Sequence, residues 1–275
     1  MNQKLKMPFC HQLHILLIQS NNVRCYVEVN INAYEIIENI MSQYRLRTAR
    51  GNLVTPGQHY GTSLLGAPLL YFPAANPTAN TGLIIAGTHG DESAAIVALS
   101  CALRSISPQQ QRHHVILAVN PDGCQLGLRA NANGVDLNRN FPAQNWQSGD
   151  TVYRWNSAAE ARDVVLSTGE HAGSEPETQA LCTLIAQLSP RWVVSFHEPL
   201  ACIEDPASSA LGARLAANFA LPLVTTVGYA TPGSFGSWCA ELDLPCITAE
   251  LPPISADEAS ECYLAALIDL LTLAD

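Results

Sequence analysis

The sequence predicts an α/β protein with a mixed, mostly parallel central sheet and helices on both faces. Apolar strand-like runs alternate with helix-like segments along the chain, and this alternation is typical of a parallel sheet covered on both sides. The 275 residues are 48% hydrophobic and only 14% charged, so the chain can bury one sizeable core. We therefore expect a single domain rather than two.

The expected elements follow in chain order from the apolar pattern. The helix predicted at 174–188 starts with Ser174 as N-cap, Pro176 in the first turn and Glu177 at the capping-box position. The strand-like runs are 82–87, 114–120, 191–197, 221–228 and 245–251. The helix-like segments are 92–106, 174–188, 208–220 and 257–273.

The domain is expected to span 41–275. Residues 1–40 are predicted to be an N-terminal extension, because Met41 opens a natural polar start; a signal peptide is less favoured, since the apolar run "ILLI" is short. The polar stretch 121–173 is interpreted as active-site loops. The apolar terminal segment 262–274 could belong to the core or to a homodimer face, and the core is the expected use.

Charge and cysteine content limit the class of protein. The formal net charge of −10 argues against a nucleic-acid binder, which needs a basic surface. Nine cysteines without a C-x-x-C motif suggest free thiols in a reducing, cytoplasmic compartment. No apolar run is long enough to cross a membrane.

Three side chains are candidate metal ligands. His89 and Glu92 stand three positions apart where a predicted strand gives way to a helix, and His197 ends another strand. Because ligands gather beyond the carboxyl ends of parallel strands, the three could share a zinc ion. Each also has an ordinary interpretation, a capping glutamate or a histidine bonded in a polar loop. On these residues alone both interpretations stay open.

Further polar residues suit catalysis on an anionic substrate. Arg129 and Arg139 could bind a carboxylate through paired hydrogen bonds, although Asp136 and Arg139 could equally pair on the surface. Glu250 follows the apolar "CITA", and partial burial there would raise its pKa towards that of a useful base. The alternative is a strand-end carboxylate in water.

Ordered sequence blocks carry a family resemblance. Over about 41–275 the chain resembles the zinc metallocarboxypeptidases related to carboxypeptidase A. Within the family it is most similar to cytoplasmic bacterial amidases that hydrolyse the γ-D-glutamyl–meso-diaminopimelate bond of recycled peptidoglycan peptides. The blocks are "GTHGDE", "NPDG", "GVDLNRNF", "SEPET", "SFHEP", "GYATPGSFGSW" and "ITAELP".

The resemblance implies a catalytic machinery with one zinc ion per chain. His89, Glu92 and His197 match the zinc ligands of the family. Arg129 matches the arginine that polarises the scissile carbonyl, and Glu250 matches the general base. The expected activity is therefore that of a zinc metallopeptidase.

The resemblance also implies how substrate is held. Asn138 and Arg139 match the pair that grips the terminal carboxylate, and Tyr229 matches the mobile tyrosine that closes over substrate. Gly236 aligns with the specificity position, where its lack of a side chain suggests a roomy pocket. Glu204 or Asp205 could bind the extra ammonium of diaminopimelate, but a solvated loop is the expected use of "ACIEDP".

The implied substrate is the small peptide L-Ala-γ-D-Glu-meso-diaminopimelate. An alternative enzyme class is a zinc N-acyl amino-acid deacylase of the aspartoacylase or succinylglutamate desuccinylase type, which shares the H-x-x-E motif but lacks the "SEPET" and "GYATPGSFGSW" blocks. A zinc-binding sensor without catalysis is a third interpretation. The presence of Glu250 argues against it, because a pure binder needs no base.

Overall fold

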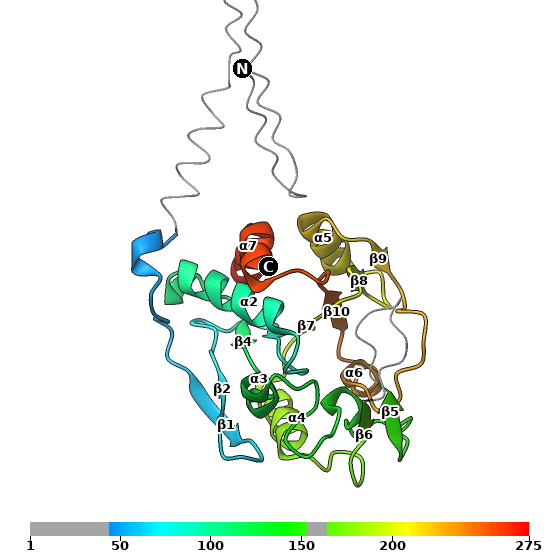
Figure 1. Cartoon of the computed structure of the whole chain (residues 1–275). Helices are drawn as coiled ribbons and strands as arrows, with labels where there is room; N and C mark the ends of the chain where they lie inside the picture. The colour runs from blue at the N-terminus through cyan, green and yellow to red at the C-terminus, as the bar shows by residue number, and fades with distance from the viewer. Residues whose placement is uncertain (1–43, 153–163, 275) are drawn as a thin grey trace, which may run out of the picture. The chain divides into compact units, whose positions relative to one another are not determined.

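A six-stranded sheet lies at the centre of the fold, with the strand order β4-β3-β7-β10-β8-β9 (Figure 1). The computed structural model describes residues 44–152 and 164–274, so the predicted extension, residues 1–40, lies outside the described residues. All elements named below belong to the unit that starts at Arg45. The strands of the sheet are β3 (Leu83–Ile85), β4 (His114–Ile116), β7 (Val193–His197), β8 (Cys202–Glu204), β9 (Leu223–Val224) and β10 (Cys246–Glu250).

Most neighbouring strands of this sheet run parallel. β3 pairs in parallel with β4 and β7, β7 with β10, and β8 with β9, whereas β8 is antiparallel to β10. Every residue of β7 is buried, as expected of a strand that is covered on both faces. The predicted fold class, with its mixed and mostly parallel sheet, is confirmed.

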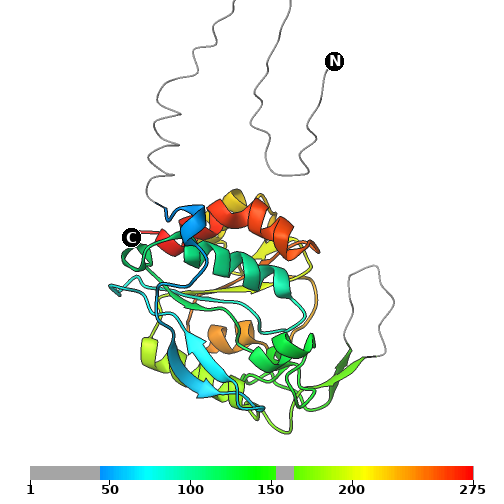
Figure 2. The same ribbon diagram turned by 60° about the vertical axis from the view of Figure 1, so that its left-hand side comes forward.

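Helices cover both faces of the sheet (Figures 1 and 2). α2 and α5 both contact α7 on one face. On the other face, α4 and α6 enclose a core cluster with sheet residues such as Leu83 and Ile116. Fully burying one such side chain contributes about 1.5–3 kcal/mol. The helices are α2 (Ser93–Ser105), α3 (Pro121–Leu126), α4 (Pro176–Leu188), α5 (Ala210–Phe219), α6 (Phe235–Glu241) and α7 (Ala256–Thr272).

Side chains alternate along β7 between these two layers. Phe196 packs on Phe219 of α5, with ring centroids 5.7 Å apart, while Val193 belongs to the cluster under α4 and α6. Residues two apart on a strand share a face, so Ser195 and His197 point to the same side as Val193. Ser195 and His197 therefore lie on the α6 side of the sheet.

The helix α4 begins differently from the prediction. Its N-cap is Glu175, and Ser174 instead donates a hydrogen bond from Oγ to the Glu175 carboxylate. Glu177 does not close a capping box, because its buried carboxylate accepts hydrogen bonds from the Leu64 backbone and from Asn131. Tertiary partners therefore outcompete the local cap that the sequence predicts. Pro176 does stand in the first turn, as predicted.

The terminal helix serves the core. Buried residues of α7, among them Tyr263 and Leu267, face α2 and α5, which confirms the expected core use of this segment. In the described part of the chain, no helix combines the length and apolarity that a membrane span requires. The cysteines of the described residues are all free thiols.

Several short elements escape the sequence analysis. The predicted strand at 221–228 shrinks to Leu223–Val224, because β9 lies at the sheet edge and pairs with β8 alone among the described strands. The polar stretch 121–173 contains short ordered elements rather than loops alone. Elements not predicted are β1 (Gln58–Thr62), β2 (Pro68–Tyr71), β5 (Asp150–Val152), β6 (Val165–Ser167), β8, α3, α6, and the 3-10 helices η1 (Arg47–Ala49), η2 (Pro108–Gln110) and η3 (Leu137–Arg139).

Candidate metal centre and active-site cleft

Three candidate ligands meet beyond the carboxyl ends of β3 and β7. His89 lies in the turn that follows β3, and Glu92 is the N-cap residue of α2. His197 is the last residue of β7. Since β3 and β7 are parallel neighbours, the chain delivers all three side chains to one edge of the sheet. Each of the three is at least nine-tenths buried.

The donor atoms of these residues converge closely. His89 Nδ1 lies 2.8 Å from Glu92 Oε1, and His197 Nδ1 lies 2.9 Å from Glu92 Oε2. The two Nδ1 atoms are 3.2 Å apart. One ligand atom from each residue lies within 4.8 Å of the other two. Three lone-pair donors that face one another in a buried space need protons or a cation between them, so this set fits a metal ion.

The charges of the cluster are strongly coupled. Burial and Arg129 lower the pKa of His89, but the carboxylates of Glu92 and Asp136 outweigh them and raise it to about 9. Burial raises the pKa of the Glu92 carboxyl, whereas the two imidazoles dominate and lower it well below its usual range. A divalent cation between the ligands would replace the protons that hold this arrangement together.

Asp136 orients His89 from behind, a role that the sequence analysis does not assign. Its Oδ1 lies 3.0 Å from His89 Nε2, and Arg129 Nε lies 3.4 Å from its Oδ2. Asp136 is only 2% exposed. The alternative that it pairs with Arg139 on the protein surface is therefore wrong. A carboxylate on the second ring nitrogen fixes the tautomer that leaves Nδ1 free for a metal. The position of Asp136 inside the "GVDLNRNF" block is the signal that could have found it.

Glu198 is a second residue that the sequence analysis does not assign. Its Oε1 accepts hydrogen bonds of 2.9 and 3.2 Å from the backbone N–H groups of Ala94 and Ala95 in the first turn of α2. Burial raises the pKa of its carboxyl to about 7 although these N–H groups lower it. Glu198 therefore fastens the end of β7 to the start of α2, which holds His197 beside Glu92.

Glu250 stands next to the ligand cluster. It is the last residue of β10 and pairs directly with His197 of β7. The carboxylate is 8% exposed and accepts one hydrogen bond, 3.3 Å long, from the Leu200 backbone. Burial raises the pKa of this carboxyl although His197 lowers it. A strand-end carboxylate in open water is therefore the wrong alternative, and the geometry suits a base that serves the metal site.

Arg129 also contacts the ligand cluster. Its Nη1 donates a 2.9 Å hydrogen bond to Glu92 Oε1. The guanidinium thus lies within reach of any group bound at the ligand cluster. This cluster lines one end of a cavity of about 1300 Å³.

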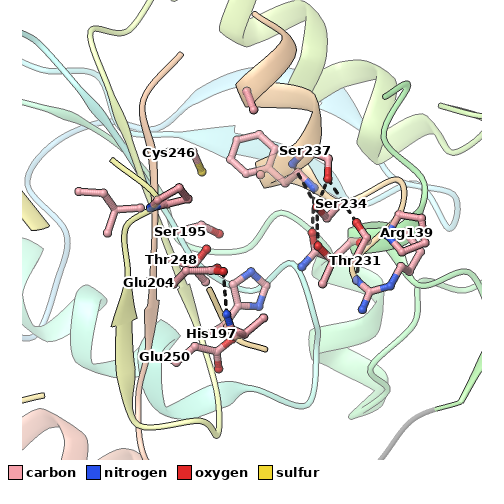
Figure 3. A pocket seen from close by; sticks show the side chains of 18 of the residues that line it. Arg139, Ser195, His197, Glu204, Thr231, Ser234, Ser237, Cys246, Thr248 and Glu250 are labelled. Carbon is pink, nitrogen blue, oxygen red and sulfur yellow. Dashed lines mark hydrogen bonds between the residues drawn. The ribbon is translucent and has the colours of Figure 1, made fainter. Parts of the chain in front are cut away.

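The far wall of the cavity carries the predicted substrate-binding residues. Asn138 and Arg139 belong to η3, and Asn138 Oδ1 accepts a 2.9 Å hydrogen bond from the Phe235 backbone at the start of α6. Figure 3 shows Arg139 across the cavity from His197 and Glu250. Tyr229 lines the same cavity but is 55% exposed and makes no hydrogen bond through its hydroxyl with the described residues.

The residues considered for substrate specificity, Gly236, Glu204 and Asp205, have different surroundings. A Cβ built on Gly236 would meet nothing within 4 Å, which agrees with a roomy pocket. Asp205 is buried and accepts hydrogen bonds from Ala207 and Ser209, so it organises its own turn rather than a solvated loop. Both residues line the cavity, but Glu204 is the last residue of β8 and its side chain lies beside Thr248 and Ser195 (Figure 3). The expectation of a solvated loop is wrong for both.

Comparison with known proteins identifies relatives over most of the chain. The zinc carboxypeptidase family profile matches residues 43–201. Murein peptide amidase A of Escherichia coli K12 is 68% identical over 231 residues, which cover 84% of this chain and 96% of that protein. The corresponding protein of Vibrio campbellii is 57% identical over 225 residues, covering 82% and 91%.

Solved structures give the same result. The crystal structure of murein-tripeptide amidase MpaA from Escherichia coli O157 matches with a TM-score of 0.83 and 67% identity, and covers 85% of this chain and 98% of that one. Carboxypeptidase A from Helicoverpa armigera shares the fold at 18% identity, with a TM-score of 0.59 over 87% of this chain and 72% of its own. The resemblance inferred from the sequence blocks is confirmed.

Proposed function

The chain belongs to the zinc carboxypeptidase family, and we propose that it hydrolyses the γ-D-glutamyl–meso-diaminopimelate amide bond of murein peptides. As a member of this family it is a hydrolytic enzyme. The substrate we propose is L-Ala-γ-D-Glu-meso-diaminopimelate, and the names of relatives at 68% and 57% identity support it. The observation that carries the proposal is the convergence of His89, Glu92 and His197 at one end of a large cleft.

These three residues would hold one zinc ion per chain. Two imidazole nitrogens and a carboxylate are a donor set that catalytic zinc uses, with a further position left for water or substrate. Zinc bound here would act as a Lewis acid on the scissile carbonyl and make an attacking water more acidic. Asp136 would keep the His89 ring in the tautomer that presents Nδ1 to the metal.

Glu250 would transfer the proton, and Arg129 would stabilise the negative charge that develops on the carbonyl oxygen. The buried Glu250 carboxylate, with its raised pKa, would accept a proton from the attacking water and pass it to the leaving amine. Arg129 would donate hydrogen bonds to the carbonyl oxygen as negative charge builds on it. A donor placed in this way is worth about 3–4 kcal/mol in the transition state.

The wall opposite would position the substrate. The leaving diaminopimelate keeps a free carboxylate beside the cleaved bond, and Arg139 and Asn138 would bind it. Tyr229 lies in an exposed loop, and its hydroxyl makes no hydrogen bond with the described residues, so it would close over the bound peptide. Fixed geometry of this kind lowers the barrier by removing the entropy cost of alignment.

We further propose a cytoplasmic location and a role in peptidoglycan recycling. The free thiols of the described residues suit a reducing compartment. The small size of the proposed substrate suits a peptide that has already been released from the cell wall.

Mass spectrometry tests the proposed activity directly. The zinc-loaded protein is incubated with L-Ala-γ-D-Glu-meso-diaminopimelate beside a chelator-treated sample. We expect L-Ala-D-Glu and free diaminopimelate in the first and intact peptide in the second. Turnover of N-acetylaspartate or succinylglutamate in place of the tripeptide would replace the proposal with a deacylase. Binding of the tripeptide without cleavage would favour a sensor.

A further inference from the structure

We propose that Glu204, together with the hydroxyls of Ser195 and Thr248, forms a subsite that binds the distal, zwitterionic end of diaminopimelate. This inference rests on the proposed function and deepens it. Diaminopimelate carries a second ammonium and a second carboxylate at the far end of a trimethylene chain. A pocket that selects this residue over a simple amino acid needs an anion for the ammonium and hydrogen-bond donors for the carboxylate.

The sheet register sets these three residues side by side. Thr248 of β10 pairs with Ser195 of β7 on one side and with Glu204 of β8 on the other. Glu250 and His197 form the next pair two residues further along the same strands. Residues two apart point to the same face, so the row of three lies on the same face as Glu250 and His197, about 6–7 Å away along the strands.

All three residues of the row line the cavity that holds the ligand cluster. Figure 3 shows their side chains grouped together, beside His197 and on the opposite side of the cavity from Arg139. A peptide whose leaving residue has one carboxylate on Arg139 would therefore extend its side chain past the ligand cluster towards this row. The open space beside Gly236 leaves room for that chain.

The first observation that indicates a ligand site at this row is the unpaired hydroxyl of Ser195. The residue is 2% exposed, and its Oγ makes no hydrogen bond with any described residue. Buried hydroxyls are almost always paired, because leaving one unpaired is costly. Here the unpaired hydroxyl lines a cavity, so a bound polar group can supply its partner.

Glu204 gives a second, independent sign. Its Oε1 accepts a 3.0 Å hydrogen bond from the Val227 backbone, while Oε2 makes none with the described residues. The carboxylate forms no ion pair in the described part of the chain, in contrast to Glu92 and Asp136 beside Arg129. A carboxylate that is oriented by the backbone and left without a cation suits an incoming ammonium.

The neighbouring acid cannot take this role. Asp205 accepts its hydrogen bonds from the turn that leads into α5, including both the backbone and the hydroxyl of Ser209. A Cβ on Gly212 would come within 2.2 Å of Asp205 Oδ2, so this carboxylate points into the helix start. Of the two acids, only Glu204 keeps a carboxylate oxygen without a hydrogen bond to the described residues.

Two peptide substrates that differ only in the distal ammonium measure the contribution of that group to recognition. Each is an L-Ala-γ-D-Glu tripeptide, one ending in meso-diaminopimelate and the other in 2-aminopimelate, which lacks the distal ammonium. For Glu204→Gln we expect kcat/KM to fall about 10- to 100-fold on the first peptide, the loss of one charge-assisted hydrogen bond. On the second peptide kcat/KM should change less than about threefold, because no ammonium is present to lose a partner.

Controls separate this subsite from a general charge effect. Glu261→Gln removes the same charge from an exposed site on α7 and should leave the ratio of the two kcat/KM values unchanged. Glu204→Asp keeps the charge but withdraws it, so its ratio should fall between those of Glu204→Gln and the wild type. Ser195→Ala should lower kcat/KM on the diaminopimelate peptide, with unchanged zinc content.

The outcomes distinguish the two proposals. An equal loss on both peptides, or an unchanged ratio in Glu204→Gln, would overturn the subsite while the proposed function stands. A wild-type protein that cleaves neither peptide would overturn the proposed function and the subsite with it.

Discussion

The two walls of the cleft are built in different ways. Around the candidate metal centre, His89 is 1% exposed, and each of its ring nitrogens lies within hydrogen-bond distance of a carboxylate. On the opposite wall, Tyr229 is 55% exposed and its hydroxyl has no partner in the described part of the chain. The side chains of the candidate metal centre are therefore held by other protein groups before substrate arrives, whereas Tyr229 gains its polar contact from the substrate.

This difference sets the size of the expected mutational effects. A buried network of coupled charges tolerates no missing member, because each removal leaves another charge unpaired. An exposed side chain that acts only on bound substrate gives up one contact when it is changed. Variants around the metal centre should therefore lower activity more than variants on the opposite wall.

The largest effect is expected from His89→Ala. This change removes one of three ligand atoms and leaves the carboxylates of Glu92 and Asp136 without their shared imidazole. We expect zinc to be lost on dialysis and hydrolysis to fall to background, measured by elemental analysis and by peptide cleavage. His59→Ala, on the exposed strand β1, is the matched control and should keep its zinc. A His89→Ala protein with a full equivalent of zinc would contradict the ligand assignment.

Glu250→Gln should rank second. The amide keeps the shape of the side chain but cannot accept a proton, so kcat should fall about 10²- to 10⁴-fold, the usual contribution of a general base. Zinc content and substrate KM should stay near those of the wild type. Zinc analysis and steady-state kinetics on the same preparation check both parts. A kcat within about twofold of the wild type would exclude Glu250 as the base.

The same carboxylate predicts a pH dependence. Burial raises the pKa of the Glu250 carboxyl above that of an exposed glutamate, which is about 4.3. The carboxylate form, which acts as the base, is therefore protonated at a higher pH than in an exposed glutamate. As pH falls through this raised pKa, kcat/KM should drop, and it should recover as pH rises again. A pH–rate profile with its acid limb at the ordinary glutamate value would contradict the assignment.

Asp136→Asn should give an intermediate effect. The residue lies behind His89 rather than among the ligand atoms, and the loss of its charge weakens the hold on the imidazole tautomer. Zinc affinity should fall about 10- to 100-fold, measured by competition with a chelator. Asp257→Asn, on the exposed first turn of α7, removes a charge that belongs neither to the ligand cluster nor to the cavity lining, and it should leave the affinity unchanged.

The positions of the candidate metal ligands and of Glu250 can be predicted from the sequence better than the rest of the cavity. His89, His197 and Glu250 follow apolar strand-like runs, and the carboxyl ends of parallel strands meet at one edge whatever the loops do. Asp136 reaches His89 from a loop with no such rule, so its contact could not be derived from the pattern. The pocket row of Ser195 and Thr248 was equally hidden, because it depends on the register between β7 and β10.

The same reasoning explains the elements that were missed. Long helices and buried central strands can be predicted from the apolar periodicity of the sequence. Short strands at exposed edges such as β1 and β9 bury too few side chains to do so. The α4 cap failed for a different reason, since Glu177 finds partners at Leu64 and Asn131 that are distant in sequence. Long-range partners are what a local pattern cannot contain.

Tyr229→Phe should give the smallest effect and sharpen the contrast between the walls. The hydroxyl has no partner among the described residues, so its removal costs the free protein nothing and leaves the melting temperature unchanged. Only contacts with bound peptide are lost, and one hydrogen bond of about 0.5–1.5 kcal/mol corresponds to a two- to roughly tenfold higher KM. Zinc content should not change. A Tyr229→Phe protein that lost zinc or stability would show that the two walls are coupled, because a residue that acts only on bound substrate cannot alter the free enzyme.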